Sequence, residues 1–100
     1  MSELETRVRE SLNELVEEET TRKLKELNIV TDVLEPRAGE VLVRFSPLSP
    51  YSPIAVDTGR MIRDAALRVE GVKSVTVQCS GHMLDELVNK LVNGQARGDR

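Results

Sequence analysis

Ser46-Pro47-Leu48-Ser49-Pro50-Tyr51-Ser52-Pro53, or SPLSPYSP, places three prolines and three serines within eight residues near the middle of the chain. Proline fixes φ and has no backbone N–H, so this stretch fits neither a helix interior nor a central strand. It is therefore predicted to be a shaped loop at which one element ends and another begins. Shaped loops of this kind often carry function.

Strands are predicted before this loop and a helix after it. Alternating β-branched runs at 29–34 and 41–45 are separated by Glu35–Glu40, where Pro and Gly indicate a hairpin. Apolar residues from Ile54 to Val69 recur at helical spacing, and Gly71 follows as a C-cap. The loop thus joins a hairpin to a helix.

The two ends of the chain supply further elements. A β-branched run at 72–78 predicts a third strand, and the apolar repeat from Met83 to Val92 predicts a helix that ends near Gly94. At the start, Ser2 and Glu5 have the spacing of a capping box ahead of an amphipathic helix. That helix either continues exposed through the polar run 17–23 or ends there.

The resulting order is α-β-β-α-β-α, which predicts a two-layer α/β (α+β) fold with a three-stranded mixed sheet covered by helices on one side. Residues 1–94 are expected to form one domain, and 95–100 a disordered polar tail. Arg97-Gly98-Asp99 in this tail would be an adhesion tripeptide only in an extracellular protein.

Composition narrows the class of partner. The 100 residues include 14 basic and 17 acidic ones, so no cationic field attracts nucleic acid or an anionic membrane. One Tyr, one Phe and no Trp cannot form a stacking platform for single-stranded nucleic acid. A single Cys excludes an internal disulfide, and no signal-peptide or membrane-spanning run is present. We expect a cytoplasmic protein whose partners are proteins or small ligands.

Topology predicts where a site would lie. A strand, a helix and a second strand in one sheet normally form a right-handed crossover, so the strands at 41–45 and 72–78 should be parallel. Their carboxyl ends then share one edge, from which the SPLSPYSP loop and Gln78–His82 both leave. Ligands favour this edge in α/β sheets. Ser52 and Cys79 are therefore expected close to one another.

Three motifs in register resemble a known family. They are Leu27–Val33 followed by Gly39 and the strand to Phe45, then Ser49–Ala55, then the strand entry Gly71–Val77. Across roughly residues 4–80 the chain is similar to the PaaD/SufT-type (MIP18-like) metal–sulfur cluster assembly domain. The resemblance implies a fold like that of other iron–sulfur cluster assembly domains. It also implies a role in cluster assembly or transfer.

Two positions depart from the family pattern. Ser52 stands where the family loop has its cysteine, and a hydroxyl is a poor ligand for cluster iron. The alternative role for Ser52 is that of an N-cap, with Pro53 as the first helical residue. Glu17-Glu18-Glu19 stands where the family has Asp-Pro-Glu. These glutamates are most simply a solvated face, and alternatively a docking surface for a basic partner.

Cys79 and His82 are the remaining chemical candidates. Their Cys-x-x-His spacing allows both to reach one metal, although a complete site would need carboxylates or a second subunit. The alternatives are a buried cysteine at a strand end and a polar residue at a helix start. A Cys-His nucleophile pair has no visible third group.

The sequence therefore predicts a non-enzymatic accessory factor in iron–sulfur cluster assembly or transfer, acting through protein contacts. Its partners would be other cluster-assembly proteins or client apoproteins, and a homodimer is left open. The expected crevice is lined by Ser49, Tyr51, Ser52, Cys79 and His82. It could hold an iron–sulfur cluster, a transition metal or no cofactor. The alternatives are an interaction module that has kept the fold and lost cluster chemistry, and a small enzyme using Cys79.

Overall fold

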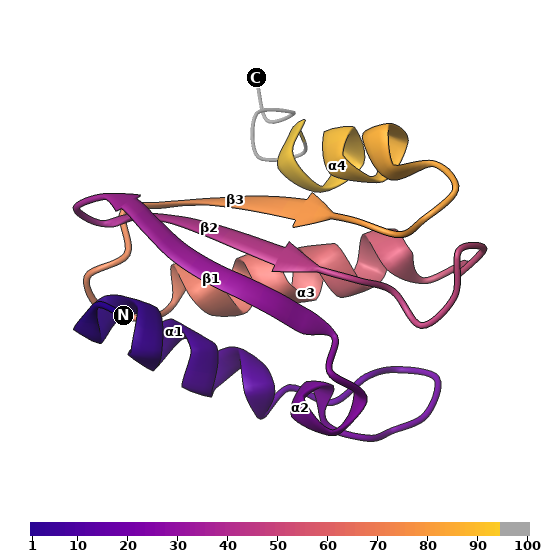
Figure 1. Ribbon diagram of the computed structural model, residues 1–100, viewed down its shortest axis with the longest axis horizontal. Coiled ribbons are helices and arrows are strands. Elements are labelled where there is room, and N and C mark those ends of the chain that lie inside the picture. Colours follow the sequence, from indigo (N-terminus) through magenta and orange to yellow (C-terminus); the bar gives the residue numbers. More distant parts are fainter. Residues whose placement is uncertain (95–100) are drawn as a thin grey trace.

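One mixed sheet organises the computed structural model, which describes residues 1–94. Its strands are β1 (Val30–Arg37), β2 (Glu40–Phe45) and β3 (Ser74–Cys79), in the order β1-β2-β3. β1 pairs antiparallel with β2, and β2 pairs parallel with β3 (Figure 1). The predicted mixed sheet and the predicted direction of the third strand are confirmed.

The hairpin is tighter than the sequence pattern indicates. β1 continues through Glu35 and Pro36 to Arg37, which leaves only Ala38 and Gly39 in the turn. Pro36 is accommodated because β1 is an edge strand and the register shifts between Leu34 and Arg37. The six-residue loop expected at 35–40 was wrong for this reason.

Within residues 1–94, four helices accompany the sheet: α1 (Glu3–Asn13), α2 (Leu24–Leu27), α3 (Ala55–Leu67) and α4 (Asp85–Gly94). The capping box is present, because the Ser2 hydroxyl accepts from the Glu5 N–H at 3.0 Å and the Glu5 carboxylate accepts from the Ser2 N–H at 2.9 Å. The first helix ends at Asn13, before the polar run. The four-residue α2 was not predicted.

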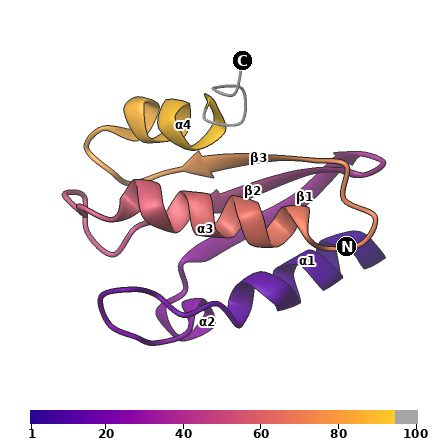
Figure 2. The ribbon, with the colours of Figure 1, turned by 180° about the vertical axis from the view of Figure 1, so that it is seen from behind.

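The core lies on one face of the sheet. Alternate residues of β2 and β3 are buried, and the residues between them are exposed or half-buried on the other face. There the Arg44 guanidinium donates to the Gln78 side chain at 2.9 Å. α1 contacts β1, and α3 contacts β3 and α1; Figure 2 shows α3 in front of the sheet. The predicted two-layer fold is confirmed.

α4 lies along the outer edge of β3 and also contacts α3 (Figure 1). Asn93 accepts from the Val77 N–H at 2.8 Å and donates to the Val77 carbonyl at 2.6 Å, and Asn89 accepts from the Cys79 N–H at 2.6 Å. Two asparagines thus take the place of a fourth strand. They cover the edge through which β3 could otherwise pair with another chain.

The polar end of the chain and the lengths of the helices remain to be described. The disordered tail at 95–100, with Arg97-Gly98-Asp99, falls outside the described residues. Across residues 1–94, every helix is too short or too polar to cross a membrane.

Candidate functional site

Two loops meet where the parallel strands end. We call Ser46–Pro53 the proline loop and Ser80–Leu84 the histidine loop. The His82 Nε2 atom lies 3.0 Å from the Ser52 carbonyl oxygen, and the Met83 N–H donates to the Pro50 carbonyl at 2.8 Å. Phe45 pairs with Cys79 directly behind the loops. The prediction that the two loops share one edge of the sheet is confirmed.

The proline loop is held by its own serines. The Ser49 hydroxyl accepts from the Tyr51 N–H at 3.0 Å, and the Ser52 hydroxyl accepts from the Ile54 N–H at 3.3 Å. Ser52 therefore caps a turn rather than the helix, since α3 begins at Ala55 and its N-cap residue, Ile54, makes no side-chain cap. The predicted helix start at Pro53 was two residues early because Pro53 and Ile54 form this turn.

The histidine loop is built around Asp85, the first residue of α4. Its carboxylate accepts from the His82 N–H at 2.8 Å and from the Gly81 N–H at 3.2 Å, and Gly81 has a φ of +104° that favours glycine. The His82 Nδ1 atom accepts from the Leu84 N–H at 3.0 Å. The ring proton is thus on Nε2, which donates it to the Ser52 carbonyl.

Cys79 is a buried residue at a strand end, as one of the two alternatives predicted. Burial, together with a hydrogen bond to the Asp85 carboxylate and the charge of that group, raises the pKa of the Cys79 thiol to about 12. The thiol is therefore protonated at neutral pH and is a weak nucleophile. Ser49 and Tyr51 lie on the exposed side of the proline loop, while Cys79 belongs to the core.

The donor atoms at this edge do not fit an iron–sulfur cluster or a transition metal. Both ring nitrogens of His82 already have partners, and the Cys79 thiol would have to lose its proton and its bond to Asp85. Ser52 brings a hydroxyl where sulfur is needed. In the described part of the chain, no group of three or more His, Cys, Asp or Glu side chains is placed to hold a metal. The arrangement of Cys79 and His82 therefore does not favour the metal site that their spacing predicts.

The joined loops expose large apolar side chains. Leu48, Tyr51 and Met83 are 45%, 71% and 66% exposed, and we call these three residues the loop-tip surface. Leu48 and Met83 were not predicted as site residues. Met83 was assigned to the apolar face of the last helix, but α4 begins only at Asp85. Periodicity alone cannot separate an exposed apolar stripe from a buried one.

An apolar groove of about 180 Å³ lies beside the loop-tip surface, between α4 and the start of α3. We call it the leucine groove; it is lined by Ser52, Pro53, Ala55, Val56, His82, Leu84, Leu87, Val88 and Leu91. A larger hollow of about 640 Å³ lies between α1 and α3 and is lined by residues such as Arg7, Glu14 and Arg68. It shares no residue with either loop.

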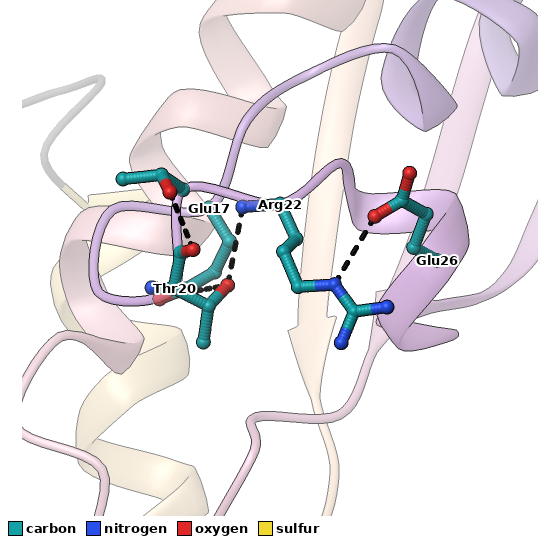
Figure 3. A network of polar contacts seen from close by, with 5 residues as sticks. Glu17, Thr20, Arg22 and Glu26 are labelled. Atoms are coloured by element: carbon teal, nitrogen blue, oxygen red, sulfur yellow. Dashed lines mark hydrogen bonds and ion pairs between the residues drawn. The ribbon is translucent and has the colours of Figure 1, made fainter.

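Glu17 was expected on a solvated face, and the structure corrects this. Its side chain is 1% exposed, whereas Glu18 and Glu19 are exposed. The carboxylate accepts from the Thr20 N–H and hydroxyl at 2.7 Å each (Figure 3). It also accepts from the Glu19 N–H at 3.0 Å. Burial raises the pKa of Glu17, but these hydrogen bonds outweigh it and hold the pKa below its usual value of 4.5.

The polar contacts around Glu17 continue along the chain to α2. The Arg22 N–H donates to the Thr20 hydroxyl at 3.2 Å, and the Arg22 guanidinium pairs with Glu26 at 3.2 Å (Figure 3). Glu17 thus organises the connection from α1 to α2, and it is not available to a basic partner.

No protein-family model and no curated protein sequence matches the chain, so its similarity to the PaaD/SufT-type domain stays a prediction.

Proposed function

We propose that the chain is a non-enzymatic accessory factor in cytoplasmic iron–sulfur cluster assembly or transfer, and that it acts by binding other proteins through the loop-tip surface. The observation that carries the interaction role is the exposure of Leu48, Tyr51 and Met83 on two loops that are hydrogen-bonded to each other. The context of cluster assembly rests on the sequence resemblance.

The loop-tip surface has the properties of a protein-binding site. Tyr and Met are enriched at interfaces, where a few such side chains supply most of the binding energy. The Met83 N–H to Pro50 bond and the His82 to Ser52 bond fix the two loops before a partner arrives. Binding to a fixed surface loses less conformational entropy than binding to a mobile one.

The geometry also favours contacts over chemistry at this edge. The Cys79 thiol is buried and protonated, so an enzyme that uses it as a nucleophile has no support. Ser52 uses its hydroxyl within the turn and its carbonyl on His82. The second candidate, an interaction module without cluster chemistry of its own, differs from the first only in the identity of the partner.

Photo-crosslinking tests the proposal. A benzophenone amino acid replaces Tyr51 in living cells that express the full chain, and the same amino acid at Leu34, on the open face of the sheet, is the matched control. We expect adducts at position 51 that are absent at position 34, and we expect mass spectrometry to identify cluster-assembly proteins or client apoproteins.

The outcomes separate the two parts of the proposal. The same adducts at both positions, or none at position 51, would overturn the interaction role of the loop-tip surface. Adducts specific to position 51 that contain only proteins unrelated to clusters would overturn the assembly context and leave the second candidate.

A further inference from the structure

The exposed side of α4, together with Leu84 directly before it, carries an apolar stripe that the monomer does not bury; the Leu84 carbonyl accepts from the Val88 N–H at 2.9 Å and so continues the line of the helix. Leu84, Leu87 and Leu91 are 55%, 48% and 39% exposed, and they recur at intervals of three and four residues. This spacing places side chains along one line of a helix, as in the seam of a coiled coil. Val88 and Val92, on the neighbouring side of α4, are buried in the core.

The stripe forms one wall of the leucine groove, so projecting side chains and a hollow lie on the same surface. A volume of about 180 Å³ is below the range of roughly 300–1,000 Å³ for sites that bind small molecules. It suits an inserted side chain better than a ligand. Under two-fold symmetry, the projecting leucines of one copy can enter the groove of a second copy, and the reverse contact forms at the same time.

The charges on α4 favour pairing with an antiparallel copy. Asp85 and Glu86 stand in its first turn, and Lys90 follows Glu86 by four residues. A two-fold axis near residue 88 brings the exposed Glu86 of each copy to the exposed Lys90 of the other, and it sets the helix dipoles antiparallel. A parallel arrangement would bring like charges together.

We propose that the occupant of this surface is a second copy of the chain, bound through antiparallel α4 helices with leucines of each copy in the groove of the other. The three leucines are each only 39% to 55% exposed, so they supply only part of the area of an interface. A standard interface uses about 800 Å² per partner, so groove walls and charged flanks must supply the rest. We expect a weak dimer, with a Kd on the order of 10–100 µM, because the apolar contact is small and exposed charges make up much of the rest.

Sedimentation velocity of the full chain from about 5 to about 500 µM tests this dimer, because the range spans the expected Kd. The weight-average sedimentation coefficient is expected to rise with concentration. Leu87→Glu should weaken association at least about tenfold. Leu34→Glu, an equal change on the open face of the sheet, should leave it unchanged. Circular dichroism confirms that both variants are folded, as expected for substitutions at exposed positions.

Charge reversal tests the antiparallel geometry. Glu86→Lys and Lys90→Glu should each weaken the dimer roughly twofold to fivefold, and the double variant should restore it because each pair is reformed with its signs exchanged. A chain that stays monomeric at every concentration, or a dimer that Leu87→Glu does not weaken, would overturn the proposal. A double variant no tighter than the single ones would overturn the antiparallel pairing.

Discussion

Single side chains decide the chemistry that this protein can perform. Cys79 is the only thiol in the chain, and its environment suppresses ionisation by burial and by the neighbouring Asp85 carboxylate. Asp85 in turn is stabilised as an anion. Burial raises the pKa of Asp85, but the hydrogen bonds from the His82 N–H, the Gly81 N–H and the Cys79 thiol lower this pKa by more than burial raises it. In the hydrogen bond between Cys79 and Asp85, the proton therefore stays on the Cys79 sulfur.

Asp85→Asn tests this assignment. The amide keeps an oxygen that can accept from the His82 N–H, but it removes the charge that helps to hold the Cys79 proton. We expect alkylation of Cys79 at a fixed pH near 8 to become several-fold faster than in the wild type, with Asp57→Asn as the control on α3. Equal rates in all three proteins would show that Asp85 does not control the thiol.

Glu17 is the other residue whose role depends on burial. Its three accepted hydrogen bonds hold the turn that joins α1 to α2, where Thr21 has a φ of +58°. Glu17→Ala should lower the free energy of unfolding by about 2–4 kcal/mol and Glu17→Gln by about 1–2 kcal/mol, because three partly buried hydrogen bonds from Glu19 and Thr20 lose a charged acceptor. Urea unfolding measures both, and Glu18→Ala, at an exposed neighbour, should change it by less than about 0.5 kcal/mol.

The stability that Glu17 supplies depends on pH in a known direction. The pKa of Glu17 is lower in the folded than in the unfolded state, so the contribution is complete above the usual value of 4.5 and is lost as the pH falls through the folded pKa. The difference in the free energy of unfolding between the wild type and Glu17→Gln should therefore shrink as the pH falls below about 4.5. A constant difference down to pH 3 would contradict this.

At the scale of elements, α4 is the part whose position needs the most explanation. It approaches α3 closely because residue 59 is glycine: a Cβ there would lie 2.6 Å from Val92 Cγ2 and 3.3 Å from Phe45 Cε1. α4 also follows β3 through Asn89 and Asn93. Four residues of helix rise about 6 Å and two residues of strand about 6.7 Å, so both asparagines meet alternate strand residues.

Gly59→Ala should destabilise the fold although alanine is the better helix former. The added methyl group meets Val92, and overpacking of this kind costs about 1–3 kcal/mol against a gain of about 1 kcal/mol in helix propensity. Thermal unfolding measures the balance. Gly94→Ala, which has nothing within 4 Å of the added Cβ, is the matched control and should be neutral or stabilising. A stable Gly59→Ala protein would mean that α4 packs less closely than described.

Asn93→Ala should both destabilise the domain and open the edge of β3. Val77 would lose the partners of its N–H and carbonyl groups, at a cost of about 2 kcal/mol. Exposed strand edges pair with other chains, so we also expect concentration-dependent aggregation in light scattering. The same change at Asn13, at the end of α1, should show neither effect. If Asn93→Ala is as stable and as soluble as Asn13→Ala, the asparagines do not protect the edge of β3.

At the scale of the whole molecule, local patterns predicted the fold well and the site only in part. Alternating residues predicted β2 and β3, and the capping box predicted the start of α1. The handedness of the crossover predicted that the two loops lie at one edge of the sheet. These features are set by short-range periodicity and chain chirality. The burial of Glu17 and of the Cys79 thiol, and the exposure of Met83 and Leu87, depend on tertiary contacts that no local pattern encodes.

The same tertiary contacts favour protein contacts over cluster ligands at this edge of the sheet. Every donor predicted to hold a metal is engaged within the fold, while the apolar side chains beside those donors face solvent. The family resemblance and the geometry are compatible if the chain assists cluster assembly without holding the cluster.

Anaerobic reconstitution with iron and sulfide, followed by absorbance, tests this claim most directly. The wild type should acquire no stoichiometric sulfide-to-iron charge-transfer absorbance, because its Cys79 thiol is buried and protonated and position 52 is serine. Ser52→Cys, which places a second thiol at the half-buried position 52 of the proline loop, should acquire more than the wild type. A wild-type protein that takes up a near-stoichiometric cluster, and loses it in Cys79→Ala, would show that Cys79 is a cluster ligand and would contradict this prediction.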